Sequence, residues 1–280
     1  MDEAARDRVA VVTGAGRGLG RGVAVALAGR GHPVVGVARN PAQLAETADI
    51  IRAAGGRMVS RPADVADPDA VEALAAFVHD QFGPPSILVN AAGIFGPIAL
   101  IRDGDPRAWV QTVMIDAIAA YLTSRQFVGG MIDAGWGRIV NVTSAASLHP
   151  PGALNSAYAT AKVALNQLTR HLAAELEGTG VTANVIHPGD VKTDMWQDIH
   201  DRVAVMGPEA EPYRQWAAWV DETGGDPPEK AVALVLELTS DAGGARNGEF
   251  CWVEAPLQAP IPSWDKPTDA RPWINDPEEA

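Results

Sequence analysis

Short apolar segments alternate along the chain with longer segments in which apolar residues recur at helical spacing. Segments that are apolar on both faces predict strands of a buried parallel sheet, and the helical spacing predicts amphipathic helices. The expected strands are residues 9–12, 33–38, 57–61, 86–90, 138–142, 181–186 and 249–253. The expected helices are residues 18–28, 41–54, 67–82, 105–131, 155–176 and 228–238.

This alternation is typical of a single doubly wound α/β domain of the Rossmann type, with a seven-stranded parallel sheet flanked by helices. We expect residues 1–255 to form the domain, with a substrate lid at about 190–226, because residues 195–225 break the alternation. Residues 256–280 hold six prolines and two tryptophans, which favours an extended arm. Anchoring on a neighbouring subunit and a disordered acidic tail both fit this composition.

Charge and composition narrow the function further. The formal net charge of −13 argues against nucleic-acid binding and against docking on anionic membranes, because both need a basic surface. The N-terminus lacks an apolar stretch, and no apolar run reaches the roughly 20 residues that a membrane helix needs. The single cysteine, Cys251, permits no intramolecular disulfide and lies in an apolar run, where it is a packing residue or a reactive thiol. We therefore expect a cytoplasmic protein.

The first expected strand leads into a glycine-rich segment, residues 13–20. Glycines between a first strand and a first helix allow a tight turn and close approach to a pyrophosphate, which the helix N-terminus attracts. A purely structural turn is the alternative. The residues expected to bind a dinucleotide here are Gly14, Gly16, Arg17, Gly18, Leu19 and Gly20.

The end of the second expected strand bears on the choice between NADP(H) and NAD(H). An acidic residue that would bind ribose hydroxyls is absent from this position, which reads Ala38-Arg39-Asn40. The Arg39 guanidinium suits a 2′-phosphate, and Arg17 could give a second cationic contact. NADP(H) is therefore favoured and NAD(H) remains possible, since both arginines could also be solvated.

The spacing of Tyr158 and Lys162 places both side chains on one face of a helix. A nearby ammonium favours the phenolate and lowers the pKa of a tyrosine, which suits proton transfer to or from a carbonyl oxygen. Ser144 follows the expected strand 138–142, at the carboxyl edge of the sheet, where it could orient that oxygen. A metal site is not indicated, because the six histidines lack ligand spacing.

These motifs, in this order, resemble the compact branch of the short-chain dehydrogenase/reductase family, over about residues 8–253. The resemblance implies hydride transfer between a nicotinamide and a carbonyl or alcohol, and a homo-dimer or homo-tetramer. It also implies contacts of Tyr158 and Lys162 with the cofactor, Lys162 at the nicotinamide ribose. Further cofactor contacts implied in the same way are Asp64, Val65, Asn90, Ala91, Gly93, Pro188, Gly189, Val191 and Thr193.

The sequence departs from the family at Asp116, where the family usually has a catalytic asparagine. The family asparagine is thought to hold a water that links the lysine to solvent. Aspartate can accept from that water but adds a charge and lacks the amide donor. We keep Asp116 as a catalytic candidate, with a proton relay that is altered or weakened.

The substrate pocket is expected where the lid meets the catalytic strand ends. The lid segment is rich in apolar and aromatic residues, which predicts a bulky, largely apolar or aromatic substrate. Packing of the lid onto the body, or a subunit contact, is the competing interpretation. Candidate substrate-lining residues are Ile94, Phe95, His149, Asn155, Met195 and Trp196.

Three functions are compatible with this sequence. An NADP(H)-dependent carbonyl reductase or alcohol dehydrogenase is the leading hypothesis. A non-catalytic cofactor-sensing protein of the same fold is the second, suggested by Asp116 alone. An NAD-preferring alcohol dehydrogenase is the third.

Overall fold

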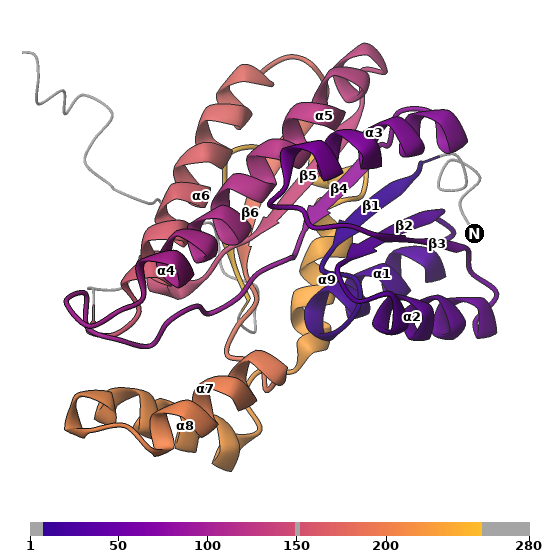
Figure 1. Ribbon diagram of the computed structural model, residues 1–280. Helices are drawn as coiled ribbons and strands as arrows, with labels where there is room; N and C mark the ends of the chain where they lie inside the picture. Colours follow the sequence, from indigo (N-terminus) through magenta and orange to yellow (C-terminus); the bar gives the residue numbers. More distant parts are fainter. Residues whose placement is uncertain (1–7, 149–151, 254–280) are drawn as a thin grey trace, which may run out of the picture.

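The computed structural model describes residues 8–148 and 152–253 (Figure 1). Its centre is a seven-stranded parallel sheet with the strand order β3-β2-β1-β4-β5-β6-β7, which confirms the predicted fold class. The strands are β1 Ala10–Thr13, β2 Val34–Ala38, β3 Met58–Pro62, β4 Ile87–Asn90, β5 Gly137–Val142, β6 Val181–His187 and β7 Phe250–Trp252.

Two layers of helices cover the sheet (Figure 1). On one face, α1 Gly18–Gly29, α2 Pro41–Ala53 and α9 Pro228–Leu238 bury Leu27, Leu44 and Leu234 in one apolar cluster. On the other face, α3 Pro68–Phe82, α5 Ala119–Asp133 and α6 Ser156–Glu175 form a second cluster that includes Phe127 and Met131. Because both faces of the sheet are buried, β1, β2 and β4 consist mainly of apolar residues.

Side-chain caps mark where four of the helices begin. The side chains of Asn40, Asp67, Asp105 and Thr193 cap α2, α3, α4 and α7 respectively, each accepting from a backbone amide of the first turn. Helices α2, α3 and α4 have proline in the first turn, where its missing N–H costs no hydrogen bond. Helix α1 differs, because its N-cap Arg17 makes no side-chain capping hydrogen bond.

The expected helix 105–131 is interrupted. Helix α4 Pro106–Val113 passes through a π-helical turn, Met114–Ile118, before α5 begins. Such turns add a residue to the helix and are frequent at functional sites. The turn contains Asp116, which is 2% exposed.

The segment after β6 is mostly helical, although its sequence predicts an interruption of the pattern. It contains α7 Asp194–Ala204 and α8 Glu211–Thr223, which pack on each other beside the carboxyl edge of the sheet (Figure 1). The two ends of the segment are joined by a bridge between Val191 and Gly225. Asp190 and Asp226 exchange two further hydrogen bonds of 3.0 Å there, so both connections to the helices run side by side.

Two of the sequence predictions, His149 as a substrate-lining residue and the arm 256–280, concern residues outside the described part of the chain. Within 8–148 and 152–253, no helix is long and apolar enough to span a membrane, and no group of three or more potential ligands could hold a metal ion. Cys251 is buried in the sheet, and burial raises the pKa of its thiol to about 11, which favours the packing role.

Candidate functional site

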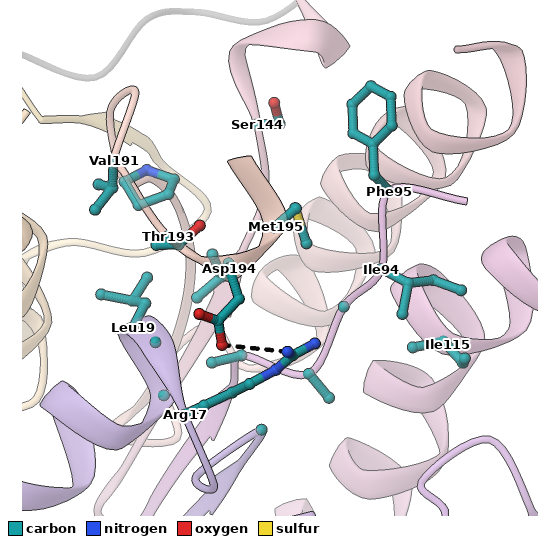
Figure 2. Close-up of a pocket in the computed structure, with 18 of the residues that line it drawn as sticks. Arg17, Leu19, Ile94, Phe95, Ile115, Ser144, Val191, Thr193, Asp194 and Met195 are labelled. Carbon is teal, nitrogen blue, oxygen red and sulfur yellow. Dashed lines mark hydrogen bonds and ion pairs between the residues drawn. The ribbon is translucent and has the colours of Figure 1, made fainter. Parts of the chain in front are cut away.

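A cavity of about 750 Å³ lies at the carboxyl edge of the sheet, between the glycine-rich loop and α7 (Figure 2). The strand order reverses between β1 and β4, and ligands of open α/β sheets bind at such a switch point. Most of the expected site residues line this cavity. They are Gly14, Gly16, Arg17, Gly18, Leu19, Gly20, Arg39, Asp64, Val65, Ala91, Gly93, Ile94, Phe95, Ser144, Tyr158, Lys162, Pro188, Gly189, Val191, Thr193, Met195 and Trp196.

Two glycines after β1, one in the loop and one in the first turn of α1, leave no room for a side chain. A Cβ on Gly14 would lie 2.8 Å from the Ala91 carbonyl oxygen, and Gly14 has a φ of +69°. A Cβ on Gly20 would overlap the backbone of Gly14. The Thr13 hydroxyl accepts from the amides of Ala91 and Ala92 at 3.1 and 3.2 Å, which ties this loop to the end of β4. The loop is therefore compressed against the sheet and leaves space above it.

The start of α1 faces that space and has the properties of an anion site. Its first amides receive no side-chain cap, and its first residues, Gly18 and Leu19, line the cavity. Uncapped amides and the positive end of the helix dipole bind phosphate groups well. These features fit the pyrophosphate of a dinucleotide.

The residues at the end of β2 bring a cationic side chain, that of Arg39, and no acidic side chain to the cavity. Arg39 is exposed and lines the cavity, and in the described part of the chain it has no ion-pair partner. Asn40 is occupied as the cap of α2, accepting from Ala42 and Gln43 at 3.0 and 3.3 Å. Asp64, after β3, accepts from the Ala66 amide at 3.0 Å and also lines the cavity.

The turn that carries Ser144 is held by a chain of hydrogen bonds to α6. The Thr143 hydroxyl donates to the side-chain oxygen Oδ1 of Asn166 at 2.6 Å, and the side-chain nitrogen Nδ2 of Asn166 donates to the Ser147 hydroxyl at 2.8 Å. Ser147 in turn donates to the backbone oxygen of Ser144 at 2.6 Å. Because Asn166 is on the helix that carries Tyr158, this chain fixes Ser144 relative to the tyrosine.

Tyr158 and Lys162 lie on the same face of α6, as their spacing predicts. The Lys162 ammonium lies 5.4 Å from the centre of the Tyr158 ring. It donates to the Val142 carbonyl at 3.0 Å and pairs with Asp116 Oδ2 at 3.1 Å. Phe95 also packs on Tyr158, with ring centres 4.9 Å apart.

The pKa of Tyr158 differs in direction from the sequence expectation. Burial raises it above the usual value of a tyrosine, and the charges of Asp116 and Asp190 raise it further. Lys162 and the hydrogen bond with Ser144 lower the pKa of Tyr158, as expected, but do not offset burial. The pKa of Lys162 is also raised, because Asp116 and Tyr158 outweigh its burial.

Three expected site residues do not line the cavity. Asp116 lies behind Lys162, and Asn155 is the N-cap residue of α6. Asn90 turns its side chain away, donating to Asn141 at 2.8 Å and accepting from Thr123 at 2.8 Å. This buried amide pair joins the ends of β4 and β5, so Asn90 supports the cavity floor from beneath.

Arg17 has a different partner from the one its sequence position suggests. It pairs with Asp194 at the start of α7 at 3.2 Å, across the mouth of the cavity (Figure 2). Both side chains are more than half exposed, so the pair contributes little to stability. Arg17, which the sequence suggests as a second contact to a 2′-phosphate, is therefore directed towards the lid.

Sequence reasoning missed several residues that line the cavity. His187 ends β6, is 6% exposed and accepts from the Ala145 amide at 3.2 Å through Nδ1. Its position directly before Pro188-Gly189 was the available signal. Asp190, Asp194 and Ile199 also line the cavity, and the folding of the segment after β6 brings them there.

Comparison with known families and proteins agrees with this geometry. Residues 8–204 match the family described as short chain dehydrogenase. Short-chain reductase protein NovJ of Streptomyces niveus is 38% identical over 251 residues, which cover 89% of this chain and 93% of that protein. The 2,3-dihydro-2,3-dihydroxybenzoate dehydrogenase of Bacillus subtilis (strain 168) is 32% identical over 219 residues, covering 78% and 76%.

A solved structure points the same way. A variant of actinorhodin polyketide ketoreductase with NADPH superposes with a TM-score of 0.79 at 28% identity, covering 88% of this chain and 95% of that one. The family match spans well over half of the chain, and two relatives exceed 30% identity over more than two thirds of it. The chain therefore belongs to the short-chain dehydrogenase family.

Proposed function

We propose that this chain, an oxidoreductase of the short-chain dehydrogenase family, uses NADPH to reduce a ketone on an uncharged aromatic or polycyclic substrate. The observation that carries the proposal is the single cavity that Ser144, Tyr158 and Lys162 share with an uncapped helix N-terminus and Arg39. When bound, the nicotinamide supplies a hydride for the carbonyl carbon.

The side chains of the chain itself would handle the oxygen and its proton. Tyr158 donates its phenolic proton to the carbonyl oxygen as the hydride arrives. Ser144 holds that oxygen by a hydrogen bond, since its turn is fixed by Asn166 and Ser147. Lys162 stabilises the tyrosinate that remains, because its ammonium lies against the Tyr158 ring.

The preference for NADPH is supported by the end of β2. A 2′-phosphate is dianionic, and a guanidinium without a competing carboxylate partner binds it in a bidentate way. In the described chain Arg39 is such a group, and Asn40 is already used as a helix cap. The similar ketoreductase structure with NADPH is in line with this preference.

The apolar end of the cavity supports an aromatic substrate. Phe95 and Met195 line it beside Tyr158, and Trp216 enters from α8. The side-chain cations among the lining residues of the described chain are Arg17, Arg39 and Lys162. Arg17 and Lys162 are paired with carboxylates, which leaves no cation near the tyrosine for a substrate carboxylate.

The lid is strongly acidic, and two of its acidic residues, Asp190 and Asp194, line the cavity. Residues 190–226 carry nine acidic and three basic side chains. Each basic side chain is already paired: Lys192 with Asp221, Arg202 with Asp198, and Arg214 with Glu211. Anionic substrates would be repelled at the mouth, so an uncharged ketone fits best.

A substrate panel tests the proposal. We expect NADPH oxidation with a bicyclic aryl ketone such as a tetralone, and a kcat/KM about tenfold or more above that for acetoacetate, because burial of an aromatic ring contributes a few kcal/mol. Faster turnover of acetoacetate would contradict the substrate class. Cofactor binding without turnover of any ketone or alcohol would instead support the cofactor-sensing alternative.

A further inference from the structure

The partner of Lys162 is the buried carboxyl group of Asp116, whose pKa is raised by burial although the Lys162 charge and the Ile94 amide lower it. The Asp116 side chain is fully buried, and that of Lys162 is 5% exposed. Asp116 Oδ2 lies 3.1 Å from the ammonium, while Oδ1 accepts from the Ile94 amide at 2.9 Å. Both oxygens therefore face donors.

An amide could not replace this carboxylate without a conflict. Asparagine has one acceptor oxygen, and its NH₂ group only donates. In the place of Asp116, the NH₂ group would face either the Ile94 amide or the Lys162 ammonium. The π-helical turn and the lack of a side chain at Gly93, whose Cβ would lie 3.3 Å from Oδ2, give the carboxylate its place.

The same contacts fix the direction of the lysine. An ammonium has three N–H donors. One donates to Val142 O at 3.0 Å, and the ammonium forms an ion pair with Asp116 Oδ2 at 3.1 Å. Lys162 also lines the cavity, where its ammonium lies 5.4 Å from the centre of the Tyr158 ring.

We propose that Asp116 is a positioning residue that holds the Lys162 ammonium and opposes its charge beside Tyr158, and that the site thereby favours carbonyl reduction over alcohol oxidation. This inference rests on the proposed function of Tyr158. During reduction, the hydride and its electron pair reach the carbonyl carbon while the phenolic O–H bond breaks and an O–H bond forms on the substrate. Water then returns the proton to the tyrosinate. Alcohol oxidation needs an ionised Tyr158 at the start, because the tyrosinate accepts the proton of the alcohol. A Tyr158 that stays protonated therefore slows oxidation.

The charges around Tyr158 agree with this assignment. Burial raises the pKa of Tyr158 most, while Lys162 from the same helix and a hydrogen bond with Ser144 from the turn after β5 lower it. Asp116 from the π-helical turn and Asp190 from the segment after β6 raise it. The uncharged ring of Phe95 packs on Tyr158, and the ring of Tyr213 from α8 packs in turn on Phe95. His187 is engaged with the Ala145 amide, and Asp194 with Arg17.

Ultraviolet titration of tyrosinate tests the inference without any substrate. The chain has three tyrosines, so subtracting the titration of a variant that also carries Tyr158→Phe isolates the ionisation of Tyr158. We expect Asp116→Asn to lower the midpoint of Tyr158 by about one pH unit or more, because the Lys162 charge is then unopposed. Asp241→Asn removes the same charge from an exposed site that pairs with Arg8, and should leave the midpoint unchanged.

Two further measurements keep the test decisive. Asp116→Ser, whose hydroxyl can still accept from Ile94, should show the same shift if the asparagine variant folds poorly. The pH profile of alcohol oxidation should move to lower pH by the same amount. An unmoved Tyr158 midpoint in both variants overturns the inference. If the midpoint shifts but the protein turns over no alcohol or ketone, the proposed function is overturned. The effect of Asp116 on the ionisation of Tyr158 would still be supported.

Discussion

At the scale of single residues, the site is shaped by which polar groups already have partners. Asn40 and Thr193 are used as helix caps, and Arg17 is drawn to Asp194. Arg39 is left facing the cavity with no ion pair in the described part of the chain. A ligand phosphate near the end of β2 would therefore depend on this one side chain.

Replacing Arg39 by serine should weaken NADPH binding selectively. A charge-assisted hydrogen-bond pair contributes about 1.5–3 kcal/mol, so we expect kcat/KM for NADPH to fall about tenfold or more. The value for NADH should change little, because NADH lacks the 2′-phosphate. Arg57→Ser, an exposed arginine just before β3 at the opposite edge of the sheet, is the matched control. Equal losses for both cofactors would contradict the role assigned to Arg39.

The sequence predicts the contiguous motifs of the site better than its isolated members. The glycine-rich loop and the pair Tyr158 and Lys162 have spacings with a direct physical meaning in a turn or a helix. Asn90 belongs to such a motif, yet its amide pairs with Asn141 from another strand. The net rise in the pKa of Tyr158 was also missed, because burial depends on the packing of Phe95 and the lid.

At the scale of elements, the lid shows where sequence patterns fail. Gly207-Pro208 and Gly224-Gly225 interrupt the segment, which suggests irregular structure. These positions in fact separate and end the two helices, α7 and α8. Conversely, residues 105–131 form an uninterrupted helical pattern, and the π-helical turn within it depends on tertiary contacts of Asp116.

Helix α8 offers a matched pair of tryptophans. Trp216 lines the cavity, whereas Trp219, one turn later, is 49% exposed. We expect Trp216→Ala to raise KM for an aryl ketone about tenfold, because an apolar contact of a few kcal/mol is lost, and to leave the binding of NADPH unchanged. Trp219→Ala should leave both unchanged. If the two variants behaved alike, α8 would not form part of the substrate site.

At the scale of the whole molecule, the sheet brings together residues that are far apart in the sequence. The ends of β1, β4, β5 and β6 lie next to each other, so the loops after them meet at one edge. The alternation of strands and helices along the chain is sufficient to predict this edge, because parallel strands joined by helices all end on the same side. The lid boundaries and a homo-dimer or homo-tetramer stay predictions.

The central claim is that Tyr158 supplies the proton for a nicotinamide-dependent reduction. Its most direct test is the turnover of Tyr158→Phe with NADPH and the best ketone of the panel, beside Tyr121→Phe, whose ring is 48% exposed on α5. We predict that Tyr158→Phe lowers kcat about a hundredfold or more, the scale of general acid catalysis, while its thermal stabilisation by NADPH equals that of the unsubstituted chain. Tyr121→Phe should retain full activity. Turnover by Tyr158→Phe at the rate of the unsubstituted chain would contradict the account.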